Sequence, residues 1–362
     1  MTNAELITAI KTANDAAIAA GVDLTEDNAT AIDVAVAALG LADISTLAQL
    51  NAAYAALANP AVTDVDLTTS IKSYSGSGSD NIFSGAVIGA NATGTTLNAG
   101  DVLNGGLGDD TLSVSFSGNA DAAVVGVTMN SVETLSISNF STSNAANTTF
   151  DATLATGLTT VSVIASSADG DTQVTALQNI VAAEMKNGTA DLQLDYAASV
   201  VAGASNTQSL SLMNQTNGTF TSAGVETVNV SSTVANNTLL GLTTTSITNL
   251  NISGDKNLTI TNAVDFADAA SATAVDGTVS AVGFTGNLNL TFAADVVNVT
   301  GGSGGDTFNF AGTLTTLDAV DGGDGVDTVT MTGVADGSTT ALSTFGFSNV
   351  EKYSVAGADE AS

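Results

Sequence analysis

Apolar and polar residues alternate with two different periods along the chain. In residues 1 to about 59 the apolar residues recur at spacings of three and four, as in Ile10, Ala13 and Ala17, which is typical of amphipathic helices. From residue 61 onward, short runs such as TLSVSF, TTVSVI and NLNLTF place an apolar residue at every second position, which indicates strands. The pattern predicts an α-helical cap or assembly domain over 1–60 and a mainly β domain over 61–362.

The predicted strands are short, numerous and separated by Gly, Asn, Asp and Ser. This arrangement indicates a solenoid or a stack of short sheets, in which each turn adds one layer of strands. One segment breaks the pattern: TALQNIVAAEMKNG has a helical period and ends at Gly188. We therefore predict a helical insertion near residues 174–187.

The charge balance narrows the choice of partners. The chain contains 36 acids and 5 bases, for a net charge of −31. Binding to nucleic acid requires Lys and Arg to neutralise phosphates, and anionic membrane surfaces repel such a chain. We therefore expect no nucleic-acid partner, and a cation is the natural ligand for such a field.

The absence of His and Cys excludes Ser-His-Asp and Cys-His catalysis and thiolate or histidine metal sites, so the sequence predicts a non-enzymatic protein. No run approaches the ~18 apolar residues of a membrane span. The N-terminal sequence also lacks the basic and apolar regions of a signal peptide. The chain is therefore expected to be cytosolic, or exported without an N-terminal signal.

A glycine–aspartate motif carries the predicted chemistry. GGLGDDTL, GGSGGDTF and GGDGVDTV fit G-G-x-G-x-D-x-U, where U is apolar, and SGSGSDNI is a weaker copy. This is the repeat of calcium-binding parallel β-rolls: Gly allows tight turns and Asp supplies the hard oxygen that Ca²⁺ prefers. The alternative is that each Asp merely bonds backbone amides. The candidate calcium residues are Gly76, Gly78, Asp80, Asp101, Gly105, Gly106, Gly108, Asp110, Gly301, Gly302, Gly304, Asp306, Asp318, Asp321, Gly322, Gly323, Asp324, Gly325 and Asp327.

Spacing suggests how neighbouring motifs cooperate. Asp101 lies nine residues before Asp110, and Asp318 lies nine before Asp327. If successive turns share an ion, these pairs are the expected partners. Asp306 has Val at the corresponding position, so its partner must come from elsewhere, and Asp321 and Asp324 are the candidates.

A second repeat consists of VETLSIS, VETVNVS and VEKYSVA. Glu133, Glu226 and Glu351 have the parity of the buried residues that follow them, and a bare buried carboxylate is costly. Either each strand begins after its Glu, which then caps amides at a corner, or the Glu binds a cation. The sequence favours the corner.

These motifs resemble calcium-dependent bacterial surface-layer proteins of the RTX type, such as that of Caulobacter. The resemblance rests on GDVLNGGLGDDTLSVS followed by SVETLSIS, on SITNLNISGDKNLTIT, and on VNVTGGSGGDTFNF, AVDGGDGVDTVTMTG and NVEKYSVAG. It implies a right-handed parallel β-solenoid with calcium turns, self-assembly into a lattice on the cell surface, an N-terminal region that anchors to lipopolysaccharide, and type I-like export.

The sequence therefore predicts a structural protein that assembles with itself into a calcium-stabilised extracellular surface layer. Cell-surface polysaccharide or lipopolysaccharide is a further expected partner. Two alternatives stay open: a filament, matrix fibre or virion-associated appendage built from the same solenoid, and an exported carbohydrate-binding or polysaccharide-cleaving solenoid.

Overall fold

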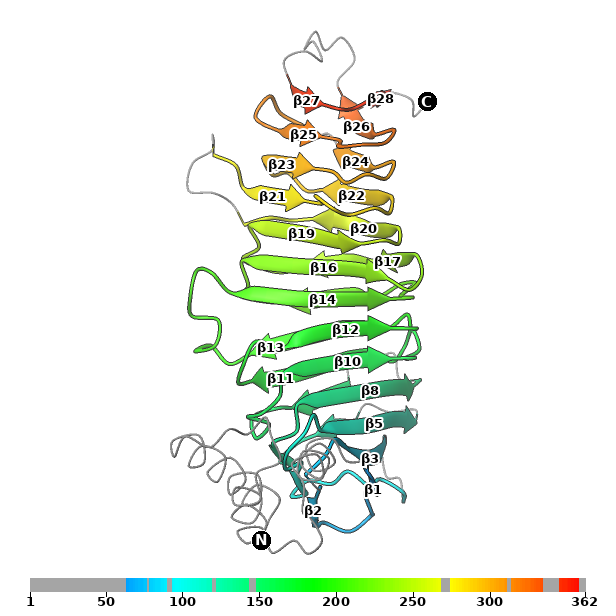
Figure 1. The fold of residues 1–362 in the computed structure, drawn as a ribbon, viewed down its shortest axis with the longest axis vertical. Coiled ribbons are helices and arrows are strands. Elements are labelled where there is room, and N and C mark those ends of the chain that lie inside the picture. Colours follow the sequence, from blue (N-terminus) through cyan, green and yellow to red (C-terminus); the bar gives the residue numbers. More distant parts are fainter. Residues whose placement is uncertain are drawn as a thin grey trace, which may run out of the picture.

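The computed structural model describes residues 63–357, apart from residue 77 and the stretches 90–92, 119–121, 143–147, 268–273, 311–313 and 335–344. The helical region expected over residues 1–60 lies outside the described part of the chain. Within that part the chain is mainly β, and its parallel strands form a β-solenoid of about 10 turns (Figure 1). None of the described residues belongs to a helix long and apolar enough to cross a membrane.

One long sheet runs the length of the solenoid, and three shorter sheets provide the return strands. We call the long one sheet A. Its strands, in order, are β1 (Thr63–Asp66), β3 (Asn81–Ile88), β5 (Thr111–Gly118), β8 (Thr134–Ser141), β10 (Thr160–Ile164), β12 (Ala182–Lys186), β14 (Thr207–Met213), β16 (Thr227–Thr233), β19 (Asn249–Gly254), β21 (Gly277–Ser280), β23 (Val297–Thr300), β25 (Ala319–Asp321) and β27 (Gly346–Ser348).

The return strands form sheets B, C and D. Sheet B contains β2 (Ser73–Ser75), β4 (Val102–Asn104) and β7 (Thr128–Asn130). Sheet C contains β6 (Ala123–Val124), β9 (Thr148–Asp151), β11 (Thr172–Leu177), β13 (Leu192–Tyr196), β15 (Thr219–Ser222) and β18 (Gly241–Thr243). Sheet D contains β17 (Asn237–Leu239), β20 (Leu258–Val264), β22 (Leu288–Phe292), β24 (Thr307–Phe310), β26 (Thr328–Val334) and β28 (Lys352–Gly357).

The alternating pattern works because successive side chains of a strand point to opposite faces. Leu112, Leu135 and Val161 are register partners on β5, β8 and β10, and all three are fully buried. Each rung, meaning one sheet A strand with its return strands, therefore adds its apolar residues to one continuous core. Strands predicted from the alternation are confirmed along the described chain.

The helical insertion predicted near residues 174–187 is wrong, because this segment contains β11 and β12. β12 pairs with β10 on one side and β14 on the other, so the backbone groups that a helix would satisfy internally are satisfied by neighbouring rungs. A bend occurs at Ala176, which has φ 55°. This bend puts both Val174 and Leu177 in the core and produces the three-residue spacing that imitates a helix.

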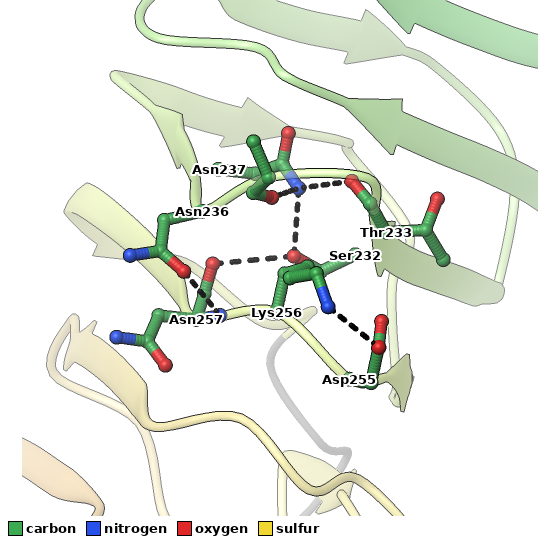
Figure 2. Close-up of polar contacts among 8 residues, drawn as sticks. Ser232, Thr233, Asn236, Asn237, Asp255, Lys256 and Asn257 are labelled. Atoms are coloured by element: carbon green, nitrogen blue, oxygen red, sulfur yellow. Dashed lines mark hydrogen bonds and ion pairs between the residues drawn. The ribbon is translucent and has the colours of Figure 1, made fainter.

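Polar side chains hold the corners between sheets. In Figure 2 the side chain of Asn237, at the corner between β16 and β17, donates to Ser232 Oγ at 2.8 Å and to the Thr233 carbonyl at 3.2 Å. Its Oδ1 accepts the N–H of Gln215 from the preceding rung at 2.7 Å. A buried corner amide thus links two rungs, and acids take the equivalent place at other corners.

Candidate metal sites at the glycine-rich corners

The three full motifs occupy two separate places on the solenoid. GGLGDDTL joins β4 to β5, where the chain enters sheet A, whereas GGSGGDTF and GGDGVDTV join β23 to β24 and β25 to β26, where it leaves sheet A for sheet D. β5 and β23 are the third and eleventh strands of sheet A. The motifs are therefore two distinct clusters and not one continuous series of turns.

In each full motif the Asp sits directly before a strand, and one of its carboxylate oxygens accepts a backbone N–H from the preceding rung. Asp110 accepts from Asn81 at 2.7 Å, Asp306 from Leu288 at 2.9 Å, and Asp327 from Asp306 at 2.8 Å. All three aspartates are inaccessible to solvent. The apolar residue two positions later is fully buried in every case, as the motif predicts.

The first glycine of each motif is fixed by close packing between rungs. A Cβ on Gly105 would lie 1.7 Å from the Ser131 carbonyl oxygen and 2.3 Å from Asp110 Oδ2. On Gly322 it would lie 2.0 Å from the Asn349 carbonyl oxygen and 2.6 Å from Asp327 Oδ2. The carbonyl of the next rung and the motif's own carboxylate thus converge on the glycine, so this position excludes every other residue type.

The later glycines serve the turn itself. Gly106, Gly108, Gly323 and Gly325 have φ between +91° and +126°, a conformation that other residues rarely adopt. In the second cluster a Cβ on any of four positions would meet a carbonyl of the preceding rung, and three of these carbonyls belong to glycines. These positions, with their distances, are Gly302 (2.3 Å), Gly304 (2.2 Å), Gly323 (2.2 Å) and Gly325 (2.1 Å).

The weaker copy, SGSGSDNI, lies one rung before the first motif. Its alignment with that motif in the structure differs by one residue from the alignment that the two sequences suggest. Asn81, and not Asp80, is the rung equivalent of Asp110, since Ile82 pairs with Thr111. Asn81 Oδ1 lies 2.0 Å from the Cβ position of Gly76, which reproduces the glycine–carboxylate contact with an amide. Asp80 accepts the N–H of Asp109 at 2.9 Å, and Gly78 is buried in the turn.

The VE repeats confirm the corner interpretation. Each strand begins directly after its Glu, and one Oε of the Glu accepts a backbone N–H from the preceding rung. Glu133 accepts from Asp110 at 2.8 Å, Glu226 from Asn206 at 2.7 Å, and Glu351 from Asp327 at 2.8 Å. The residue before each Val has positive φ and turns the corner; these residues are Ser131, Gly224 and Asn349.

The two repeat families therefore meet in space. Glu133 lies one rung beyond Asp110, and Glu351 lies one rung beyond Asp327, at sequence separations of 23 and 24 residues. A column of acids results at each cluster, in which every carboxylate accepts the N–H of the residue below it. Sequence reasoning missed this column, although the similar spacing from the Asp of two glycine–aspartate motifs to the Glu of the following VE was its signal.

Burial and like charge perturb these acids. Burial raises the pKa of Asp110 to about 6; the N–H of Asn81 opposes the shift, and the charges of Glu133, Asp80 and Asp109 add to it. Burial also raises the pKa of Asp306 and of Asp327, and Glu351 contributes to the shift at Asp327. The folded chain thus disfavours the ionised form at both clusters.

Two of the three aspartates have an oxygen with no donor. Asp110 Oδ2 and Asp327 Oδ2 are buried and make no hydrogen bond. Asp306 Oδ2, in contrast, accepts the N–H of Gly302 at 2.9 Å. The equivalent donor for Asp327, the N–H of Gly323, bonds Asp321 Oδ1 at 3.2 Å. A buried anionic oxygen without a donor is unfavourable, and a cation would satisfy it.

The predicted nine-residue partners do not share a corner with these aspartates, so that expectation is wrong. Asp101 precedes β4, and its two oxygens accept the N–H groups of Lys72 at 2.9 Å and Asn98 at 2.7 Å. Asp318 precedes β25 and accepts from Val297 at 2.8 Å and Thr315 at 2.6 Å. Residues nine apart start successive strands on different sheets, so the carboxylate neighbours come from adjacent rungs instead.

Asp321 and Asp324, the candidate partners of the GGSGGDTF turn, do lie beside it. They line a surface pocket together with residues of that turn and with Asn349. Asp321 Oδ1 already accepts from Asn349 Nδ2 at 2.7 Å, while the Asp324 side chain is exposed. Among the described residues, no group of three or more Asp, Glu, His or Cys side chains is arranged to hold a metal ion.

Comparison of the chain with protein-family models, with curated proteins and with solved structures gives no significant match.

Proposed function

We propose that this chain is a structural, self-assembling extracellular protein that forms a calcium-stabilised surface layer on a bacterial cell. The observation that carries the calcium part is the pair of donorless oxygens at the two clusters. Asp110 Oδ2 and the Ser131 carbonyl oxygen converge on Gly105, and Asp327 Oδ2 and the Asn349 carbonyl oxygen converge on Gly322. A buried carboxylate oxygen that has no donor and lies close to a carbonyl oxygen favours a cation between or beside the two atoms.

The residues present fit a calcium ion by chemistry. Asp110, Asp80, Asp109 and Glu133 form one group of charges, and Asp327, Glu351, Asp321 and Asp324 form the other. Ca²⁺ takes six to eight oxygens in flexible geometry, and the glycine turns supply carbonyls beside these carboxylates. Bound calcium would supply positive charge, while the chain's own residues hold neighbouring rungs in register.

Calcium dependence and an extracellular location support each other. Extracellular calcium modules bind at about 10⁻⁴–10⁻³ M, so such sites fill outside the cell and stay empty in the cytosol. A chain with net charge −31 repels itself until cations bind. Export by a type I-like route, followed by folding outside the cell, is the proposal that fits this order.

Electron microscopy of the full chain with and without millimolar calcium tests the function. We expect ordered sheets with calcium and dispersed chains after chelation. Fibres in place of sheets would favour a filament, which the structure also supports: β1 and β27 are the two edge strands of sheet A, and a head-to-tail contact that does not close gives fibres. Chains that stay monomeric with calcium would exclude both and leave the exported carbohydrate-binding solenoid.

A further inference from the structure

Between β3 and β23 the outer face of sheet A carries almost no charge, although the chain carries a net charge of −31. Outward acids of this sheet occur near its two ends, where Asp64 and Asp66 lie on β1 and Asp321 lies on β25. From β3 to β23 the sheet contains ten strands, and their outward positions hold mainly Ser, Thr and Asn. One acid and one base occur among them, Glu184 and Lys186, and these form an ion pair at 2.5 Å. Many acids of the described chain lie in the corners and loops instead.

The small polar side chains lie in straight columns because the strands pair in register. One column runs across six successive strands of sheet A and contains a single residue other than serine; its members are Ser136, Ser162, Glu184, Ser211, Ser231 and Ser253. Side chains of this size allow a second sheet to approach to about 10 Å. Their hydroxyls also provide donors and acceptors across the contact.

The area of the outer face of sheet A is large enough for a stable protein–protein contact. Ten strands at about 4.8 Å and about five residues at about 3.3 Å give a face of about 48 by 16 Å, or about 800 Å². A specific protein interface buries about 800 Å² on each partner. Sheet C offers only six strands, and its outward positions carry Asp151 and Asp195 without a base, so like charges would oppose pairing there.

We propose that the outer face of sheet A binds the same face of a second copy of this chain; this inference rests on the proposed self-assembly. A two-fold axis parallel to the solenoid sets the strands of the two copies antiparallel, so Glu184 of each copy faces Lys186 of the other. β12 is the fifth of the ten strands, which places this charge-complementary pair near the middle of the interface. Such self-complementarity is what an isologous contact requires.

Charge variants of the full chain, studied by sedimentation and electron microscopy at millimolar calcium, test the contact. Ser211 is a half-buried outward position on the face, in register with Glu184, and Thr221 is a half-buried outward position on sheet C. Ser211→Glu should leave the chain monomeric, because each contact then gains two like charges beside the two-fold axis, whereas the control Thr221→Glu should assemble as the wild type does. Assembly of Ser211→Glu at wild-type concentrations would overturn the proposal.

A mixture of two charge-reversal variants provides a second test of the proposed contact. Glu184→Lys and Lys186→Glu should each lose self-association, because each places two like charges opposite their own copies. A one-to-one mixture should restore it, since a copy with two lysines then meets a copy with two glutamates. A purely structural role for the ion pair predicts no restoration, so a mixture of folded variants that stays monomeric overturns the two-fold contact. A wild-type chain that never assembles contradicts the proposed function as well, whereas unaffected variants contradict only this interface.

Discussion

The first glycine of each glycine–aspartate motif is the residue whose role the structure explains most fully. It lies where the carbonyl of the next rung and the carboxylate five residues later meet, as at Gly301 with the Gly322 carbonyl at 2.0 Å from its Cβ position. The same contact recurs in the first motif and in the weaker copy, where Asn81 replaces the acid. Rung packing alone therefore requires this glycine, and the Asp has a capping role that is independent of calcium.

Two glycines of a single motif test this account. Gly301→Ala should lower stability by about 1–3 kcal/mol, the usual cost of forcing atoms into a packed site. Gly305→Ala should change little, because its Cβ would lie 3.3 Å from the Val326 carbonyl oxygen and its φ is not positive. Thermal unfolding monitored by circular dichroism measures both; equal melting temperatures for the two variants would contradict the packing role.

Asp110 should make the calcium-free protein less stable as pH rises. Its ordinary pKa is 3.8 and burial raises it to about 6 in the folded chain. Between these values the folded chain keeps a proton that the unfolded chain has released, so the free energy of unfolding falls as pH increases through this window. Above the raised pKa the contribution of Asp110 to the free energy of unfolding is fully lost.

Asp110→Asn should remove much of this dependence, because the amide still accepts the Asn81 N–H and supplies a donor toward the Ser131 carbonyl. Melting temperatures of chelated protein between pH 4 and pH 8 provide the measurement. Asp101→Asn is the matched control, since both oxygens of Asp101 already accept N–H groups. An Asp110→Asn variant with the wild-type pH profile would exclude Asp110 as the source.

At the scale of elements, residues 172–186 show where local pattern and tertiary pairing disagree. More than half of the residues there are Ala, Leu, Gln, Glu, Met or Lys, which favour helix, and the apolar residues are spaced as in a helix. Pairing of β12 with strands on both sides overrides that preference, because helix propensities amount to less than about 1 kcal/mol per residue. A sequence pattern that assumes a single period along the strand cannot predict the bend at Ala176.

Glycine substitutions distinguish the bend from a helix. Ala176 has φ 55°, so Ala176→Gly should leave stability unchanged or raise it by about 0.5–1 kcal/mol. Ala183→Gly, at a buried position inside β12, should lower stability by about the same amount. Chemical denaturation quantifies both variants. A helix over this segment would instead make both variants less stable.

At the scale of the whole molecule, repulsion among the many acids lowers the stability that the stacking of rungs provides. The calcium-free chain should gain stability from salt, because raising ionic strength from about 0.01 M to about 1 M shortens the screening length from about 30 Å to about 3 Å. Calcium should raise the melting temperature further than sodium at equal ionic strength, since a calcium ion bound at the proposed sites would satisfy the donorless oxygens of Asp110 and Asp327. Calorimetry in matched NaCl and CaCl₂ compares them; identical melting temperatures would leave screening as the only effect.

The sequence by itself determined the strands, the solenoid and the burial of the residue after each glycine–aspartate turn, because alternation and turn chemistry are local properties of the chain. It also placed the VE glutamates at corners. Only the tertiary structure decided which corners stack, because rung lengths vary: Asp110 lies 29 residues after Asn81 but 23 before Glu133. A nine-residue rule therefore paired acids that start strands on different sheets, and the folded chain replaced those pairs with acid columns between adjacent rungs.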